Sequence, residues 1–199
     1  IEQHITKNSK LFFGNGTNPN IYLSANKGIG HRGIPFLEFS SDGSFMGMDI
    51  SLPSGKSLIF SFFEGSHQDN RMFISSFDES TGVLMEISDR FGSSEVSYQF
   101  GMTLDDSNLL GISSQGGFGS PENTLTSFFG IEALTKTKDF MWRSSLHVGQ
   151  TESDFNQLGL IEDIEDTYFS SFDLGVYKEN IFMKNDSIGI QVYQPLRAE

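Results

Sequence analysis

The chain has 199 residues, a formal net charge of −13 and no cysteine. This length corresponds to one large domain or, less readily, two small ones, and it can bury a core without disulfides. The absence of cysteine excludes thiol catalysis and cysteine-ligated zinc. The excess of acidic residues argues against binding DNA or RNA through phosphates and against docking on an anionic membrane leaflet.

Residues 1–33 have the least regular pattern. Two turn clusters, Gly14–Asn20 and Lys27–Gly30, flank a short strand candidate at Ile21–Leu23. We therefore predict an irregular N-terminal lead-in over residues 1–33, followed by an antiparallel β-barrel-like domain over residues 34–199.

From Ile34 onward, apolar and polar residues alternate with the two-residue period of a β-strand. The cleanest segment is Glu95–Leu104, whose apolar residues all fall on one face; a helix would scatter them around its circumference. We expect Pro195 to end the last strand, because proline removes a backbone donor from the ladder. The predicted strands are 36–40, 45–52, 57–64, 71–77, 83–88, 95–104, 109–114, 124–135, 139–149, 168–178 and 185–194.

The connections between these segments are rich in polar residues and glycine. Asp78–Gly82 is a predicted turn, and residues 151–167 are a predicted acidic loop. About ten to twelve strands with short connections predict an antiparallel meander. Long meanders commonly close, because closure removes exposed edges. We therefore expect an all-β, barrel-like or strongly curved sheet.

Catalytic motifs are weak in this sequence. No histidine occurs in the HxH or HExxH spacing that binds zinc. His147 lies on the polar face of a predicted strand near Ser144 and Ser145, and a Ser-His-Asp arrangement can assemble across a fold. However, the G-x-S-x-G nucleophile motif is absent. We favour a surface or interface role for His147 and predict no catalytic residue.

One acidic segment is the only cofactor candidate. Glu162, Asp163, Glu165 and Asp166 place four carboxylates within five positions, and carboxylate oxygens are calcium ligands. The segment lacks the EF-hand spacing and its glycine. A solvated loop tip is the favoured interpretation, with calcium binding as the alternative.

The sequence shows neither a signal peptide nor a transmembrane helix. The start at Ile1–His4 lacks the basic and apolar regions of a signal peptide, and no apolar run has the length of a transmembrane helix. Alternating strands can nevertheless form a membrane barrel. The many phenylalanines and tyrosines suit a core, a sugar or lipid site, or the outward band of such a barrel.

Several segments of the second half resemble, in order, the C-terminal region of bacterial subtilisin-like (S8 family) serine peptidases of autotransporter type. The most specific is the strand that ends in Gln194–Arg197, which reads Q-P-L-R. The resemblance covers roughly residues 85–197 and is carried by several short elements in the same order rather than by one long motif. The segments that carry it are Leu109–Gly111, Gly116–Gly119, Thr124–Ala133, Trp142–Thr151, Phe172–Tyr177 and Asp186–Arg197.

The resemblance implies a non-catalytic C-terminal β domain of a secreted or surface peptidase of a Gram-negative bacterium. Its role would be translocation, anchoring or partner binding, with an upstream peptidase domain or another protein as partner and the outer membrane as a possible location. The family's G-T-S-M-A-x-P, D-T-G and H-G-T segments are absent from this sequence. No catalytic residue is therefore implied, and the chain would be one part of a larger protein.

Two alternatives remain open. One is a free-standing extracellular module that binds a sugar or a protein; the other is a small outer-membrane β-barrel. A membrane barrel predicts an apolar outward belt with aromatic girdles, whereas a soluble domain predicts an apolar interior and a charged exterior. The two predictions are distinguished by whether the apolar or the polar face of Glu95–Leu104 is buried.

Overall fold

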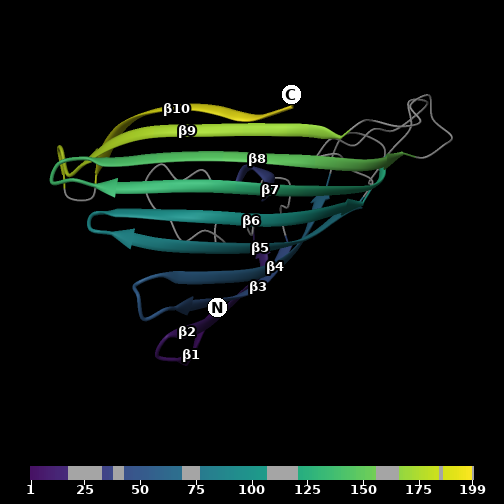
Figure 1. Ribbon diagram of the computed structural model, residues 1–199, viewed down its shortest axis with the longest axis horizontal. Coiled ribbons are helices and arrows are strands. Elements are labelled where there is room, and N and C mark those ends of the chain that lie inside the picture. Colours follow the sequence, from purple (N-terminus) through teal and green to yellow (C-terminus); the bar gives the residue numbers. More distant parts are fainter. Residues whose placement is uncertain are drawn as a thin grey trace.

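The computed structural model describes residues 1–17, 33–37, 43–68, 77–106, 121–155, 166–183 and 186–198. Within these ranges the chain forms one ten-stranded antiparallel sheet in which consecutive strands are neighbours (Figure 1). The predicted all-β antiparallel meander is therefore confirmed. No helix among the described residues is long and apolar enough to cross a membrane.

The three N-terminal strands, β1 to β3, have 5 to 9 residues. The remaining strands, β4 to β10, have 12 to 16 residues. One short 3-10 helix, η2, lies between β2 and β3 in the sequence. The elements are β1 (Glu2–Thr6), β2 (Ser9–Thr17), η2 (Pro35–Leu37), β3 (Gly43–Ser51), β4 (Ser57–Gln68), β5 (Phe77–Phe91), β6 (Ser94–Asp106), β7 (Pro121–Lys136), β8 (Met141–Phe155), β9 (Thr167–Glu179) and β10 (Ser187–Ala198).

The sheet is open, and it is not strongly curled. A meander closes into a barrel only when its first and last strands pair. In the described part of the chain, β1 pairs with β2 alone and β10 with β9 alone, and the two strands lie at opposite edges (Figure 1). The predicted barrel-like or strongly curved form is corrected to an open sheet on this ground.

The N-terminal region differs from the predicted irregular lead-in. Residues 1–17 supply β1 and β2, which continue the same sheet through the pairing of β2 with β3. The buried ring of Phe12 packs against Phe45 at 6.2 Å between centroids. This cross-strand contact explains why a glycine-containing segment is held as a strand. The strand candidate at Ile21–Leu23 lies outside the described residues.

Two other local predictions are corrected by the strand pairing. Asp78–Gly82, predicted as a turn, lies inside β5, where it pairs with β4 on one side while Ser80–Gly82 pair with β6 on the other. The ladder thus overrides a local turn preference. Part of the predicted strand at residues 36–40 is instead the helix η2, and the predicted strand 109–114 lies outside the described residues.

Proline does not end the last strand. β10 continues through Pro195 to Ala198, and its register against β9 shifts between Gln194 and Arg197. The strand is at the edge of the sheet, where a bulge accommodates a missing donor.

The sheet has two chemically distinct faces. We call outer the face that carries Tyr98 and Phe100, and inner the face that carries Ser97 and Gln99. The alternation predicted for residues 95–104 is confirmed. It continues across the sheet because each strand pairs in register with its neighbours.

An apolar cluster lies on the inner face around η2. Phe36 stacks on Phe128 of β7, with ring centroids 4.9 Å apart and planes at 6°. A Cβ on Gly149 of β8 would overlap the Phe36 ring, so glycine is required for this close approach. The cluster consists of Phe12, Ile34, Phe36, Leu37, Phe45, Ile59, Phe63, Leu84 and Phe128, with Phe169 and Leu196 partly buried against it.

Candidate functional site

The outer face is apolar and exposed, whereas the inner face is buried and carries both the apolar cluster around η2 and a set of polar side chains. On β6, Phe100 and Met102 are 44% and 46% exposed, whereas Gln99 and Thr103 are 0% and 1% exposed. The same arrangement recurs on the neighbouring strands. Exposed members of the outer face include Met46, Phe60, Phe62, Met85, Tyr98, Leu104, Leu125, Trp142, Leu146, Val148, Tyr168, Phe172, Leu174, Ile188, Ile190 and Val192.

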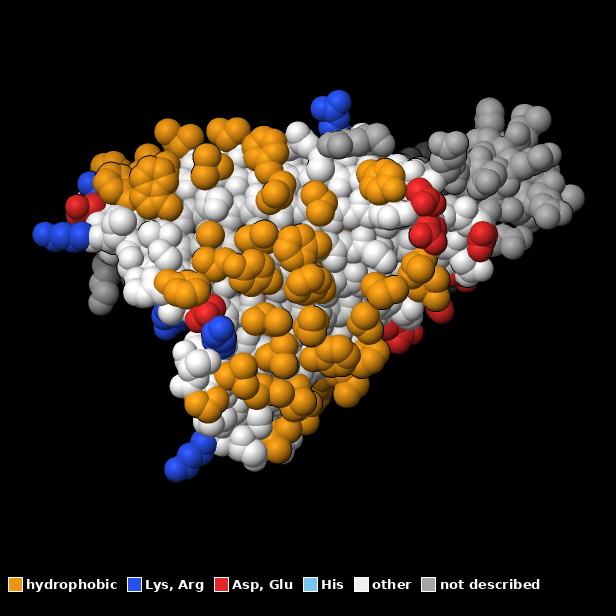
Figure 2. Space-filling view, in the orientation of Figure 1, with side chains coloured by type: hydrophobic (Ala, Val, Ile, Leu, Met, Phe, Trp, Pro, Cys, Tyr) orange, Lys and Arg blue, Asp and Glu red, His pale blue; other side chains and the backbone are white. Residues whose placement is uncertain are grey.

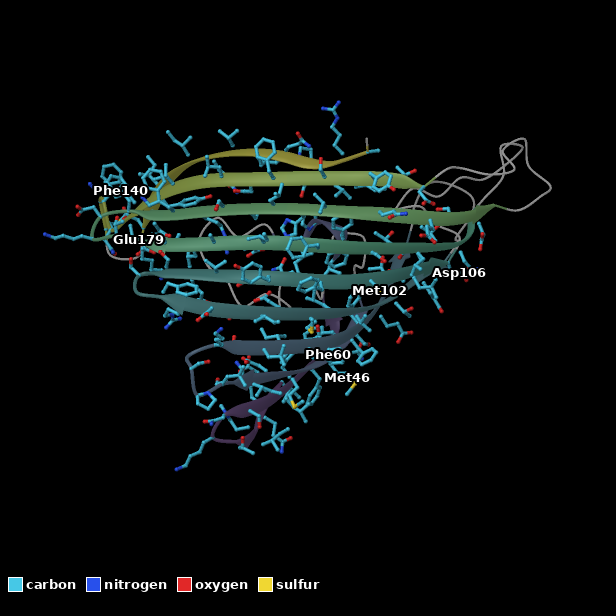
Figure 3. All side chains as sticks on the ribbon, viewed as in Figure 1. Met46, Phe60, Met102, Asp106, Phe140 and Glu179 are labelled. Carbon is cyan, nitrogen blue, oxygen red and sulfur yellow. The ribbon has the colours of Figure 1, made fainter. Side chains whose placement is uncertain are left out.

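These side chains form a broad surface, which we call the apolar belt (Figure 2). Single exposed apolar residues are ordinary, but a contiguous apolar surface of this extent marks an interaction with protein or lipid. Figure 3 shows Met46, Phe60 and Met102 within the belt, on three different strands. The belt therefore belongs to the sheet as a whole.

Charged side chains of the outer face lie toward the ends of the strands. Glu64, Asp106 and Glu152 lie toward one end of the strands, and Asp89 and Lys178 toward the other. Between them, Arg197 of β10, which pairs with Ser170 of β9, is the one charged residue at the described outer positions of β3 to β10. In Figure 3, Asp106 and Glu179 mark the two ends of the sheet, on either side of the belt.

The two ends of the sheet also differ in their connections. At one end, consecutive strands are joined by residues 7–8, 52–56, 92–93, 137–140 and 180–186, and at the other by 18–42, 69–76, 107–120 and 156–166. Exposed aromatic residues lie at the first of these ends: Phe91, Phe140 and Phe182, with Trp142 at the start of β8. The Nζ atom of Lys178 lies 5.6 Å from the centroid of the Phe140 ring.

A hollow of about 740 Å³ indents the molecule between β2 and β7. Its apolar lining comes largely from outer-face residues such as Met46, Phe62 and Met102. Glu64 and Asn15 are among its few polar members. Such a lining suits hydrocarbon better than a polar ligand.

The inner face holds a buried polar network centred on Gln99. The Gln99 amide Nε2 donates to Oε2 of Glu86 at 3.0 Å, and its Oε1 lies 3.0 Å from Nε2 of His147. His147 Nε2 is also 3.9 Å from Oε1 of Glu132. All four side chains are at most 2% exposed, so the four adjacent strands β5 to β8 are linked by polar contacts away from water.

A second set of charges extends the network toward β10. Arg143 of β8 interacts electrostatically with Glu132 and with Asp173 of β9. Asp173 Oδ2 accepts a hydrogen bond from the amide of Gln191 in β10. Burial, followed by repulsion from Glu86, raises the pKa of Glu132 to about 7, so Arg143 and Gln99 compensate this carboxyl only in part.

The structure places His147 in this network and away from a catalytic arrangement. Its Nε2 faces Gln99 and Glu132, and among the described residues its Nδ1 has no hydrogen-bond partner. Ser144 lies on the opposite face of β8, and no serine hydroxyl of the described residues bonds to the imidazole. The described geometry therefore provides no serine–histidine pair.

The predicted calcium segment is only partly described. Asp166 accepts a hydrogen bond from Nε2 of Gln150 at 2.7 Å, while Glu162, Asp163 and Glu165 lie outside the described residues. No group of three or more His, Asp or Glu side chains in the described part of the chain is arranged to hold a metal ion.

The links among Gln99, Glu86, Glu132 and Arg143 are not predicted from the sequence. Each falls on the polar side of a long alternating segment. The one sequence feature that indicates a buried polar network is the presence of charged residues in the middle of predicted strands, where charged residues are uncommon. Their pairing depends on strand register, which a single sequence does not supply.

We expect Gln99→Leu to destabilise the folded protein by roughly 2–5 kcal/mol. The change leaves both a buried carboxylate and a buried imidazole without their amide partner, and each unsatisfied buried group costs about 1–3 kcal/mol or more. Chemical denaturation measured by tyrosine fluorescence or circular dichroism checks this. The matched control is Gln150→Leu, which removes an exposed hydrogen bond to Asp166 and should change stability by less than about 0.5 kcal/mol. Equal losses in the two variants would contradict the role of the network.

The hairpin tip between β9 and β10 is organised by Asp186. Its carboxylate accepts hydrogen bonds from the backbone N–H groups of Ile181, Phe182 and Met183 at 2.7–2.9 Å. Desolvation acts to raise the pKa of Asp186, but the three hydrogen bonds outweigh it and lower the pKa below the usual 3.8. The turn thus presents Phe182 and Met183 to the exterior in a defined conformation.

This lowered pKa predicts an acid-sensitive turn. A carboxyl whose pKa is lower in the folded state stabilises the fold above its unfolded-state pKa, and this contribution is lost as the pH falls through the folded-state pKa. We expect the backbone amide protons of Ile181, Phe182 and Met183 to titrate together in NMR spectra, with a midpoint below 3.8. Asp186→Asn should abolish that titration, while the amide of Val176 serves as an unaffected control. Independent midpoints for the three amides would contradict the shared carboxylate.

No family model, curated protein or solved structure matches this chain significantly. The interpretation of the site accordingly depends on the geometry described above and on the resemblance of short sequence segments.

Proposed function

We propose that the chain is a membrane-embedded β domain whose apolar belt contacts lipid and whose inner face, with its polar network and the apolar cluster around η2, is turned away from lipid. The observation that carries this proposal is the inversion on β6, where Phe100 and Met102 are exposed while Gln99 and Thr103 are buried. A soluble domain buries its apolar face. In transmembrane β-sheets the apolar side chains face outward, and the polar ones face inward.

The dimensions and ends of the sheet support the same function. A strand of about 9–11 residues crosses the hydrocarbon layer when tilted, and β4 to β10 are each at least 12 residues long. Aromatic residues at one end and charged residues at both ends fit the two interfaces with water. Shorter connections at one end than at the other are typical of outer-membrane β-sheets.

The sequence resemblance supports a more specific role within this class. Similarity to the C-terminal region of autotransporter-type subtilisin-like peptidases favours an outer-membrane domain of a Gram-negative bacterium. In this proposal the chain anchors or translocates a peptidase domain or another protein and has no catalytic role itself. Cell fractionation tests the location: the domain should partition with outer membranes and resist extraction with carbonate.

Fluorescence of the single tryptophan tests the membrane proposal. Trp142 is the only tryptophan in the chain, and its side chain is exposed on the outer face near the first residue of β8. On refolding into phosphatidylcholine vesicles, its emission should shift to the blue. Lipids brominated near the carbonyl group should quench it more strongly than lipids brominated near the chain end, because Trp142 lies close to the interface.

A second reporter gives the depth profile. Leu146→Trp in a Trp142→Phe background moves the fluorophore four positions along the same face of β8, or about 13 Å at 3.3 Å per residue. Here lipids brominated deeper in the chain should quench more strongly. Emission that stays water-exposed at both positions, with no quenching by either lipid, would instead support the free-standing binding module.

A further inference from the structure

The hollow of about 740 Å³ on the outer face lies over β5, which carries smaller side chains there than the strands on either side. Val83 of β5 pairs with Phe62 of β4 and with Met102 of β6, and all three line the hollow. A small residue between two large ones leaves a depression with apolar walls. Its volume falls within the roughly 300–1,000 Å³ that is usual for small-molecule sites.

One end of the hollow is polar. Ser44 and Asn15 line it together with Glu64, and the Ser44 hydroxyl donates a hydrogen bond to Oδ1 of Asn15 at 3.1 Å. The Glu64 side chain is exposed. The charge at this end of the hollow is therefore negative and open to a ligand.

Two further carboxylates lie beyond this end. Glu79 of β5 and Asp106 of β6 are exposed on the outer face, each two residues further toward the strand ends than Thr81 and Leu104, which line the hollow. Figure 3 shows Asp106 beyond Met102 in this direction, and Figure 2 shows acidic side chains gathered at this end of the belt.

We call Glu64, Glu79 and Asp106 the acidic rim. Among the described residues of β2 to β7, no lysine or arginine lies at this end of the strands. Carboxylates grouped beside an apolar surface produce a negative potential that attracts cations and repels anions. The ligand that complements both features has a hydrocarbon part and a positively charged part.

We propose that the hollow binds an amine-bearing lipid, with its hydrocarbon chain between Phe62 and Met102 and its ammonium group at the acidic rim. The hollow extends from the rim toward the middle of the belt, so the lipid keeps the direction that lipids have in a bilayer. An anionic headgroup would be repelled by the rim. The source of the ligand, a lipid of the surrounding membrane, rests on the proposed membrane location.

Methionine methyl groups report directly on this site, because Met46 and Met102 line the hollow. The protein, with isotope-labelled methionine methyl groups, is placed in phosphatidylcholine nanodiscs and titrated with dodecylamine, which is cationic at pH 7 like other aliphatic amines. The NMR signals of Met46 and Met102 should shift and saturate. Val148→Met adds a lipid-facing reporter on β8, outside the hollow, and its signal should shift less than about a third as far.

Two probes with the same chain length test the role of charge. Dodecylamine should bind at least about fivefold more tightly than dodecanol, the gain expected from exposed ion pairs at the rim. Dodecanesulfonate, which is anionic, should bind more weakly than dodecanol. Equal affinities for the three probes, or tightest binding of dodecanesulfonate, would overturn the proposal.

Variants of the rim separate charge from fold. Glu64→Gln combined with Glu79→Gln and Asp106→Asn should reduce the preference for dodecylamine over dodecanol to less than about twofold, while both probes still bind. Asp89→Asn is the matched control, because Asp89 lies on the same face at the opposite end of β5, where it pairs with Lys56 at 3.3 Å. It should keep the full preference, and an unchanged preference in the rim variant would contradict the role of the rim.

A variant within the hollow tests the hydrocarbon site. Val83→Phe places a larger side chain between Phe62 and Met102, and it should weaken binding of all three probes by at least about fivefold. Equal shifts at Met46, Met102 and position 148 would show that the probe dissolves around the whole belt, and this would overturn the proposal. Quenching of Trp142 by brominated lipid in the same nanodiscs reports the membrane location separately, so the two failures are distinguishable.

Discussion

Val148→Arg is expected to destabilise the protein in lipid bilayers by about 2–4 kcal/mol. Val148 lies near the middle of β8, opposite Phe129 of β7 and Ser170 of β9, and its side chain is exposed on the outer face. An arginine on the lipid-facing side of a transmembrane sheet costs this amount at the bilayer midplane. Urea titration of the vesicle-bound protein, followed by Trp142 emission, measures the change.

A substitution at the edge of the belt is the matched control. Leu125 is also exposed on the outer face, near the beginning of β7 and opposite Glu152. Leu125→Arg should cost only about 0–1 kcal/mol, because the side chain reaches the interface. If Val148→Arg changed stability by less than about 0.5 kcal/mol, as expected for a water-exposed surface position, the membrane proposal would be contradicted.

Phe36→Ala is expected to destabilise the fold by about 3–5 kcal/mol, the usual cost of removing a buried aromatic ring. Phe36 is 1% exposed and stacks on Phe128, and it belongs to the cluster that also touches Leu196 of β10. Its loss leaves a cavity on the inner face between η2 and the sheet. Equilibrium unfolding in urea measures the effect.

An exposed phenylalanine supplies the comparison for this variant. Phe182 is 82% exposed at the β9–β10 hairpin tip, so Phe182→Ala should leave the free energy of unfolding within about 0.5 kcal/mol of the unmodified value. Phe36→Leu should lose less than Phe36→Ala, because it keeps most of the apolar volume. If the Ala variant were as stable as the unmodified chain, η2 would not be part of the folded core.

The sequence predicted the meander well because the two-residue period is a local property. Glu95–Leu104 and Tyr168–Lys178 were both identified as strands, and they lie within β6 and β9. Asp78–Gly82 lies in a strand and not in the predicted turn, because turn-forming residues are tolerated in a strand that is paired on both sides. The helix η2 was missed because its conformation depends on packing against β7.

The chemistry of the two faces was less predictable. Alternation places Tyr98 and Gln99 on opposite sides of β6, but it does not say which side is buried. The buried links among Gln99, Glu86 and His147 depend on register across β5 to β8, which joins residues distant in the sequence. Charged residues in the middle of polar strand faces were the one local sign of this network.

Spin-label accessibility along β6 tests most directly whether the apolar belt faces lipid. Single cysteines at positions 97–104 of the cysteine-free chain would carry the label in phosphatidylcholine bilayers. Collision with oxygen, which concentrates in lipid, should be high at positions 98, 100 and 102 and low at 97, 99 and 103. Collision with a water-soluble nickel chelate should be low at positions 98, 100 and 102. High nickel accessibility at these three positions would contradict the account, because it would place the apolar belt in water.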